Sequence, residues 1–313
     1  RLQLGVRPRR EPARGGPRTD APSENATRVR WLGTAGHVVQ TATTTVLLDP
    51  FLTRPGIRRM IARPLRSTPD AWAGWVPEKV DAICCGHSHY DHLLDAPGIA
   101  LRTGAKLLGS GTTIQFARAE GVPESQLEEV PPEGRVVRVG DVDVRFVPSL
   151  HGRIALGRVP FPGEVKQPPR LPARAWHYRM GGAFGVHLTT PFGRLYHNGS
   201  ADLVDAELEG LRAETLLVGL AGRLATRDYL KRLVEAPEPE LLVPTPHDAF
   251  FGPLQVGPRH FPRLYLARLL SAARGPSPPA CLAPPSYLHP PPVPRYPRAA
   301  AYPQSPPCTG LRP

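Results

Sequence analysis

The residues of this chain that are best suited to chemistry lie together in the stretch CCGHSHYDH, residues 84–92. This stretch places four side chains with metal-binding groups within six positions: His87, His89, Asp91 and His92. Imidazole nitrogens and carboxylate oxygens are ligands that suit zinc (Zn2+), and also manganese, iron or nickel. The stretch therefore predicts a metal site. The two adjacent cysteines before it lack the CxxC spacing of a zinc knuckle or a redox pair.

Three further candidate ligands each follow an apolar stretch, at the point where that stretch ends. His151 follows VRFVPSL, Asp202 follows RLYHNGSA, and His247 follows LLVPTP. If these stretches are strands whose ends converge on one edge of the fold, their side chains are held rigidly and close together. Two divalent cations need such a ligand set. A Ser–His–Asp triad with Ser88 or Ser149 as the nucleophile is the alternative interpretation.

Hydrophobic periodicity predicts the elements that must position these side chains. Short strands are expected within residues 29–52, and further strands over 80–86, 105–110, 214–222 and 240–248. Hairpins are expected around the turns at 140–141 and 192–193, and helices over 91–104 (as a helix or a broken helix), 111–121, 226–236 and 261–274. Strands precede strand–helix alternation in each half of the chain. This order predicts an α/β fold with two sheets and helices outside them, a four-layer αββα sandwich.

Composition divides the chain into a folded body and two unusual ends. Residues 1–30 carry eight Arg against three acidic residues, and residues 275–313 carry three Arg, no acidic residue and fourteen prolines. We therefore predict a disordered basic segment over 1–27, a folded domain over 28–273 and a disordered proline-rich tail over 274–313.

The same composition limits the location and the partners of the protein. No run of about 18 apolar residues is present, so we expect no transmembrane segment. Because +8 of the net charge of +12 lies in the two ends, the body carries a modest +4, and we do not expect a nucleic-acid partner. We expect a cytoplasmic protein with reduced cysteines, and a cleaved leader or a peripheral membrane contact is the alternative.

Four motifs together resemble the metallo-β-lactamase-fold hydrolases. HSHYDH matches the HxHxDH motif of that superfamily, and PSLHG, NGSADL and PTPHD resemble its later ligand motifs in the expected order. The resemblance covers roughly residues 28–255. The opening WLG…DPF and the ending HDAFFGPL are most similar to the branch of ascorbate-6-phosphate lactonase-like proteins and N-acyl-phosphatidylethanolamine-hydrolysing phospholipase D.

This resemblance implies a dinuclear metal site and a role for each candidate residue. His87, His89 and His151 would bind the first metal, Asp91, His92 and His247 the second, and Asp202 would bridge both with a water-derived hydroxide. Asp91 would also act in catalysis by orienting the nucleophile, and Asp49 would be a buried aspartate that supports the metal-binding loop, with a simple turn aspartate as the alternative. Many members of the family carry Gly before the bridging aspartate, where this chain has Ala201.

The segment 153–179 has no predicted regular structure and follows His151 directly. Loops of this length are usually functional or disordered. We predict that this segment overhangs the metal site, where Phe161, Trp176 and Tyr178 would pack against the apolar part of a substrate. A phosphate group would be met by Arg158, or by Arg153, Arg170 or Arg174. A solvent-exposed insertion is the alternative. His37 and His197 are assigned to packing.

The sequence thus predicts a dinuclear metal-dependent hydrolase in which a metal-bridging hydroxide attacks a lactone, an ester or a phosphodiester. Its substrate would be a small molecule or a lipid-like compound. The cofactors would be two divalent ions, with zinc the first choice and manganese, iron or nickel the alternatives. A metal-dependent nuclease of the same superfamily and a metal-binding scaffold without turnover are the competing hypotheses.

Overall fold

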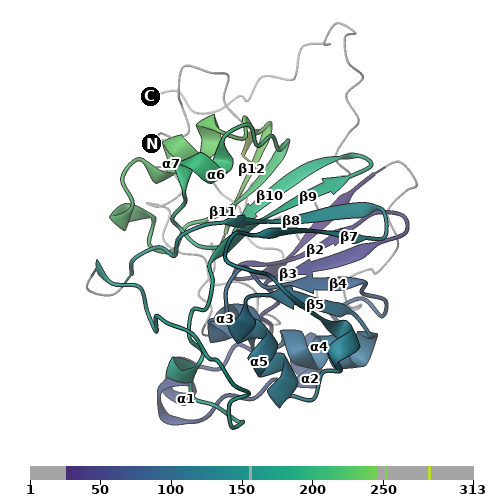
Figure 1. The fold of residues 1–313 in the computed structure, drawn as a ribbon, viewed down its shortest axis with the longest axis vertical. Coiled ribbons are helices and arrows are strands. Elements are labelled where there is room, and N and C mark those ends of the chain that lie inside the picture. The colour runs from purple at the N-terminus through teal and green to yellow at the C-terminus, as the bar shows by residue number, and fades with distance from the viewer. Residues whose placement is uncertain (1–25, 155–156, 246–250, 252–280, 283–313) are drawn as a thin grey trace, which may run out of the picture.

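Two β-sheets pack face to face in the computed structural model, which describes residues 26–154, 157–245, 251 and 281–282 (Figure 1). The first sheet runs in chain order through β1 (Arg28–Gly33), β2 (Gly36–Gln40), β3 (Thr45–Leu48), β4 (Ala82–Cys84), β5 (Lys106–Gly109) and β6 (Leu127–Glu129). The second sheet has the order β13 (Cys281–Leu282), β12 (Leu241–Thr245), β11 (Thr215–Gly219), β10 (Gly193–Asn198), β9 (Phe184–Thr190), β8 (Val142–Pro148) and β7 (Arg135–Val139).

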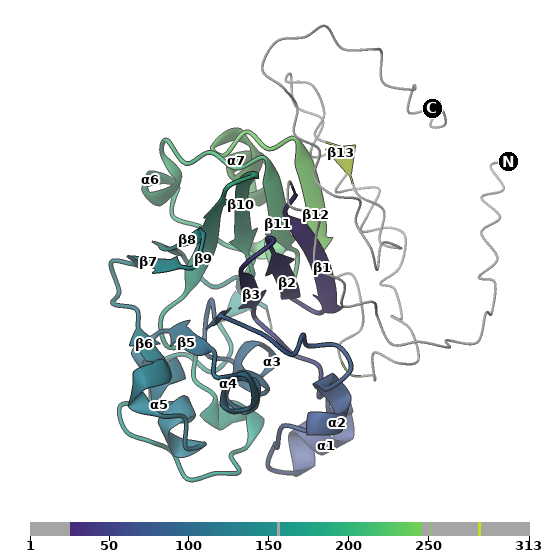
Figure 2. The same cartoon turned by 90° about the vertical axis from the view of Figure 1, so that its right-hand side faces the viewer.

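Helices cover the outer face of each sheet (Figures 1 and 2). The first sheet is covered by α1 (Ile57–Ala62), α2 (Pro69–Trp72), α3 (Tyr90–Leu93), α4 (Ala96–Thr103) and α5 (Gly111–Ala119). The second is covered by α6 (Asp205–Leu208) and α7 (Tyr229–Glu235). The predicted four-layer αββα sandwich is confirmed.

Three hydrophobic clusters fill the three spaces between these four layers. One lies between the helices and the first sheet and includes Ile83, Leu93 and Phe116. The second lies between the two sheets, where residues of β3, β4 and β5 meet Phe146 and other residues of β8 to β11. The third lies between the second sheet and its helices, with Tyr196 at its centre. The central strands are therefore buried on both faces, and β3, β4 and β11 are buried along their whole length.

Strand direction brings the predicted ligand positions to one edge of the sandwich. In the first sheet β3, β4 and β5 run parallel to one another. In the second sheet β8 and β10 both run antiparallel to β9, while β10, β11 and β12 are parallel. Because β8, β10 and β12 point the same way, the segments that follow their ends leave the sheet at the same edge. His151 and Asp202 lie in two of these segments.

Several local features differ from expectation or fall beyond the described residues. The helices α1 and α2 occupy a segment for which no element was predicted. Two residues of the predicted proline-rich tail form β13, which pairs with β12. His247 and the helix predicted over 261–274 lie outside the described residues. None of the helices in the described ranges is long and apolar enough to span a membrane.

Candidate metal centre

The loop that carries His87, His89 and His92 is held to both sheets by backbone hydrogen bonds. It follows β4 through Cys85, whose backbone N–H donates to the carbonyl of Leu108 on β5. The Gly86 carbonyl accepts from the N–H of Phe184, at the start of β9 in the second sheet. The Ser88 N–H donates to the carbonyl of Met180 at 2.9 Å. Cys84 and Cys85 are buried free thiols at the end of β4, as expected.

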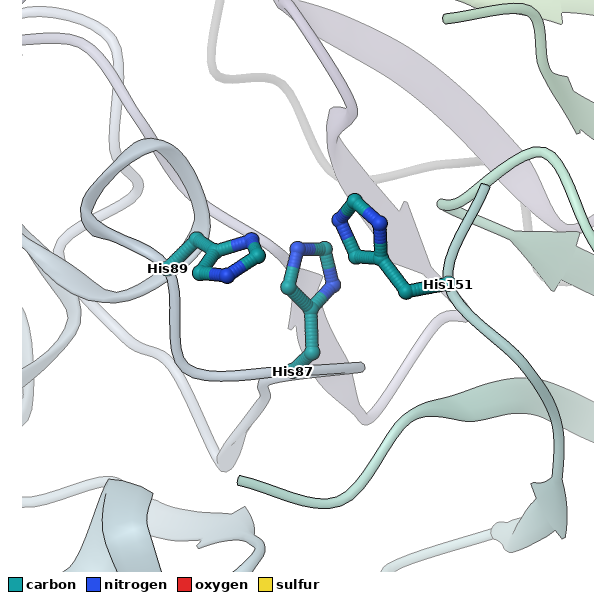
Figure 3. Close-up of side chains that lie close together, drawn as sticks. All are labelled: His87, His89 and His151. Carbon is teal, nitrogen blue, oxygen red and sulfur yellow. The ribbon is translucent and has the colours of Figure 1, made fainter. Parts of the chain in front are cut away.

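His87, His89 and His151 converge on one point between the loop after β4 and the end of β8 (Figure 3). One ligand nitrogen from each ring lies within 4.8 Å of those from the others, which is a spacing that one metal ion can span. The centroids of all three pairs of rings are 4.7 Å apart. All three side chains are buried. We call these three residues the histidine cluster.

The hydrogen bonds of the histidine cluster fit a metal ion. The Nε2 atoms of His87 and His89 are buried and have no hydrogen-bond partner within the described part of the chain. The Nδ1 atom of His151 lies 2.7 Å from the Gly152 carbonyl, so Nδ1 carries the proton and the lone pair is on Nε2. Metal-binding histidines use this arrangement, in which the second ring nitrogen donates to a carbonyl. Buried nitrogens that lack a partner in the protein require another partner, which a metal ion would supply.

Electrostatics keeps the histidine cluster in the neutral form that binds metals. Burial lowers the pKa of His87 and His151, and burial lowers the pKa of His89 to about 4. The neighbouring imidazoles lower these pKa values further, whereas the carboxylate of Asp91 acts in the opposite direction on His89. Each ring is therefore uncharged at neutral pH, which removes the competition between protons and a metal ion.

The predicted ligands of the second metal are placed less closely together. The ring of His92 lies 3.7 Å from that of His87 between centroids, and its Nε2 is 3.8 Å from Asp91 Oδ2. Asp202 follows β10, and its Oδ1 accepts from the N–H of Leu203 at 2.9 Å. Burial lowers the pKa of His151, and the charge of Asp202 acts weakly in the opposite direction.

Within the described residues, the three members of the histidine cluster are the group of ligands that could hold one ion. Asp91, His92 and Asp202 border this group, and His247 lies outside the described residues. The structure therefore brings together the three residues that were predicted to bind the first metal, and metal binding by them stays a prediction. The second site remains a prediction.

Asp49, which was predicted to support the metal-binding loop, lies directly behind it. Its side chain is fully buried, and its Oδ1 accepts from the Gly86 N–H at 2.7 Å. Its Oδ2 lies 3.0 Å from Nδ1 of His92, close enough for an ion pair although the two groups are not aligned as a hydrogen bond. Burial alone would raise the pKa of Asp49, but the charge of His92 and a hydrogen bond from His197 hold the pKa well below its usual range.

His197 is the residue near the site that the sequence analysis missed. It was assigned to packing, yet its Nε2 lies 2.9 Å from Asp49 Oδ2. The signal in the sequence is its position on β10. His197 lies two residues after Leu195, which faces the space between the sheets. Because residues two apart on a strand share one face, His197 also points into the core. A buried imidazole in such a position requires a polar partner.

The long segment after His151 is held against the site by backbone hydrogen bonds. The Met180 N–H donates to the Phe161 carbonyl, and the Gly181 N–H donates to the Gly163 carbonyl, each at 2.9 Å. The Val165 N–H donates to the hydroxyl of Thr112 at the start of α5. The segment forms almost no regular structure, as expected, but it is connected to the body at many points.

Phe161 is the predicted substrate residue that lies against the histidine cluster. Its ring centroid is 6.1 Å from that of His89, in an edge-to-face contact. Its φ of 40° is in the left-handed region, which is a strained conformation for a bulky side chain. Strain of this kind is common at functional sites.

The other three predicted substrate residues lie elsewhere on the segment. Arg158 is exposed. Trp176 is 39% exposed and packs against the guanidinium of Arg174. Tyr178 differs from the expectation, because it is 3% exposed and its ring stacks on Phe116 at 4.3 Å. Tyr178 therefore contributes to the hydrophobic core rather than to an open substrate surface.

Comparisons with known proteins give the family of the chain and the extent of the likeness. The family model of the beta-lactamase superfamily domain matches residues 44–231, more than half of the chain. A metal-dependent hydrolase of Anaeromyxobacter dehalogenans is 36% identical over 128 residues, which cover 40% of this chain and 43% of that protein. A metal-dependent hydrolase of Methanopyrus kandleri is 27% identical over 241 residues, which cover 75% of this chain and 90% of that protein.

A solved structure shows the same fold. The metallohydrolase Igni18 of the archaeon Ignicoccus hospitalis superimposes with a TM-score of 0.50 at 18% identity. The superposition covers 79% of this chain and 91% of that one. At this identity the likeness concerns the fold alone. The match to the Anaeromyxobacter protein spans less than half of its length.

Proposed function

Because the chain belongs to the beta-lactamase superfamily, we propose that it is a metal-dependent hydrolase whose centre is the histidine cluster. The observation that carries this proposal is the convergence of three buried imidazoles whose nitrogens lie within 4.8 Å of one another. Two of these imidazoles have an Nε2 atom without a partner in the described residues. The names of the relatives, which are called metal-dependent hydrolases, support the same reaction class.

The donor set favours zinc at the histidine cluster. Three neutral imidazoles leave a fourth position open, which is the arrangement of catalytic zinc sites. We propose a second ion beside it, held by Asp91, His92 and His247, with Asp202 shared between the two. When bound, such ions would lower the pKa of a water molecule and polarise the carbonyl or phosphoryl group of a substrate. Manganese, iron or nickel would be the alternatives.

The side chains of the chain would orient the reactants. Asp91 is 22% exposed, so its carboxylate can reach a water molecule at the mouth of the site. We assign it the role of accepting a hydrogen bond from the attacking water and fixing its direction. The Phe161 ring next to His89 would limit the shape of the substrate and exclude bulk water from one side.

We propose that the substrate is a lactone, an ester or a phosphodiester of a small or lipid-like molecule. The lactonase-like and phospholipase D-like resemblance of the opening and closing motifs supports this class. The exposed Arg158 would meet an anionic group of the substrate. We also propose a reducing compartment such as the cytoplasm, supported by the two free thiols at the end of β4.

Metal analysis combined with a substrate panel tests this function. The purified protein is loaded with zinc, dialysed and analysed for metal, and we expect about two ions per chain. It is then assayed against lactones, phosphodiesters, phospholipids, β-lactams and RNA. Asp91→Ala should abolish turnover with the fold intact, and His151→Ala should lower the metal content as well.

The exposed His177 supplies a matched control, because it lies on the substrate segment and outside the histidine cluster. His177→Ala should keep both metal and turnover. A protein that takes up no metal, or full activity in Asp91→Ala, would refute the proposal. Turnover of RNA alone would instead identify a nuclease, and metal uptake without any turnover would identify a scaffold.

A further inference from the structure

The carboxylate of Asp49 joins the two sheets at a point directly behind the histidine cluster. Asp49 follows the last residue of β3 in the first sheet. His197 lies on β10 in the second sheet, and its Nε2 is 2.9 Å from Asp49 Oδ2. Both side chains are fully buried. A buried carboxylate without a hydrogen-bond partner is very costly in free energy. The hydrogen bond that His197 donates from the second sheet is therefore significant here.

The same carboxylate contacts both ends of the metal-binding loop. Its Oδ1 accepts from the Gly86 N–H at 2.7 Å, one residue before His87. Its Oδ2, which also accepts from His197, lies 3.0 Å from Nδ1 of His92. The loop from 86 to 92 is therefore held at its first and last residues by one side chain. Any rotation of that side chain would move both ends of the loop.

Two glycines enclose this carboxylate so closely that no side chain fits beside it. A Cβ atom added to Gly199 would lie 2.6 Å from Asp49 Oδ2 and 2.9 Å from His197 Nε2. A Cβ added to Gly86 would lie 2.9 Å from the carbonyl of Phe184 and 3.3 Å from Asp49 Oδ2. Neither glycine has a positive φ, so this close approach is the reason for glycine at both positions.

We propose that His197 is a positioning residue for the metal centre. By donating from Nε2 to Asp49, it fixes the orientation of the carboxylate, which in turn fixes Gly86 and His92 and so the whole metal-binding loop. This inference rests on the proposed function, because it assumes that the loop binds a metal. It assigns a role at the site to a residue of the second sheet that neither contacts substrate nor binds the ion.

The competing explanation is that His197 only fills space between the sheets. Its ring also packs edge to face against His37, with centroids 5.4 Å apart, which is a packing contact. The two explanations differ in what a replacement must keep. Packing requires the shape of the ring, whereas positioning requires a hydrogen-bond donor at the place of Nε2.

Two substitutions separate shape from donor. His197→Phe keeps a ring but removes the donor, and His197→Gln loses the ring but keeps an N–H group that reaches the same place. The affinity for zinc is measured by competition with a coloured chelator, which requires no turnover. We expect His197→Phe to weaken zinc binding by about 10- to 100-fold, the range typical of residues that orient metal ligands. We expect His197→Gln to stay within about 3-fold of the wild type.

The neighbouring strand supplies the control. His187 on β9 is paired with Tyr196 in the register and hydrogen-bonds to the Arg212 carbonyl rather than to Asp49. His187→Phe should therefore leave the zinc affinity unchanged. Unfolding by urea in the presence of a chelator reports separately on any loss of stability in each variant.

A double-mutant comparison keeps the test decisive if His197→Phe folds poorly. In an Asp49→Asn background no buried charge is left to compensate, so His197→Phe should be tolerated. It should also have no further effect on zinc affinity, because the carboxylate that His197 orients is gone. An additional loss in that background would show that His197 acts by packing and would overturn the inference.

Equal zinc affinity of wild type and His197→Phe would also overturn it, while the proposed function would stand. A wild-type protein that binds no zinc would overturn the proposed function and this inference together.

Discussion

Acidification should destabilise the metal-free protein, and His89 should account for about 2 kcal/mol of the loss between pH 7 and pH 5. His89 is 4% exposed, and its burial lowers its pKa from 6.5 to about 4, with further lowering by the neighbouring imidazoles. Between these two values the unfolded chain binds a proton that the folded protein does not. The free energy of unfolding therefore falls as the pH falls through this window. The slope is about 1.4 kcal/mol per pH unit, acting over about 1.5 units from pH 6.5 to pH 5.

Other histidines contribute to the same titration with different signs. His87 and His151 also have lowered pKa values, so they too destabilise the folded protein in acid. His92 acts in the opposite direction. Burial would lower its pKa, but the Asp49 carboxylate raises it, so its contribution is full below pH 6.5 and is lost as the pH rises through the folded value. The total pH dependence is therefore a difference, and a single variant is needed to isolate one residue.

The variant His89→Gln isolates the contribution of His89. Urea unfolding is measured at pH 7 and pH 5 with a chelator present, for wild type and variant. The fall in the free energy of unfolding should be about 2 kcal/mol smaller in the variant, whatever its stability at pH 7. His177→Gln, a change at an exposed histidine, should keep the wild-type fall. An equal fall in wild type and His89→Gln would refute the reasoning, because it would show that the buried ring does not resist protonation.

Three further predictions follow from single contacts. Asp95 accepts from two backbone N–H groups and two hydroxyls, so Asp95→Ala should lower the free energy of unfolding by about 3 kcal/mol or more, measured by urea unfolding. Phe161→Gly should raise the KM of an active substrate with a smaller effect on kcat, because the ring beside His89 shapes the site and takes no part in bond breaking; an unchanged KM would contradict this role. Cys84 and Cys85 are buried, and burial raises the pKa of both thiols. In a variant that lacks the other two cysteines, a thiol reagent at pH 8 should therefore modify them only after urea is added.

The sequence predicted the sandwich because its strands carry strong periodic signals. The hairpin at Gly140 was expected from local residues alone, and residues 91–104 were expected to form either one helix or a broken helix. The helices α1 and α2 were not predicted, since they have only six and four residues, which is too short for a clear helical periodicity. Tyr178 was assigned to the substrate surface because a loop gives no sign of which aromatic rings turn inward.

The sequence also predicted only part of the site. Position after a strand end identified the candidate ligands, because strand direction determines which side chains meet at an edge. The resemblance to the metallo-β-lactamase-fold hydrolases grouped three of them into the histidine cluster. The link from His197 to Asp49 joins residues 148 positions apart in different sheets. No local pattern encodes such a pairing. Only the packing of one sheet on the other brings the imidazole to the carboxylate.

A comparison of Asp49 with Asp95, which is the other fully buried carboxylate among the described residues, shows why the partners of Asp49 matter. Asp95 is fully buried, and burial raises its pKa although four neutral donors oppose this rise. Asp49 is equally buried, but the imidazoles of His92 and His197 outweigh the effect of burial and lower its pKa. Asp49 is thus the carboxylate whose charge is set by groups of the metal centre. An ion bound at His92 would change the field at Asp49 through that ring, whereas Asp95 contacts only backbone and hydroxyl groups of residues 52, 53 and 67. Removing Asp49 should therefore alter metal binding beyond any loss of stability, and removing Asp95 should alter metal binding only as far as it unfolds the protein.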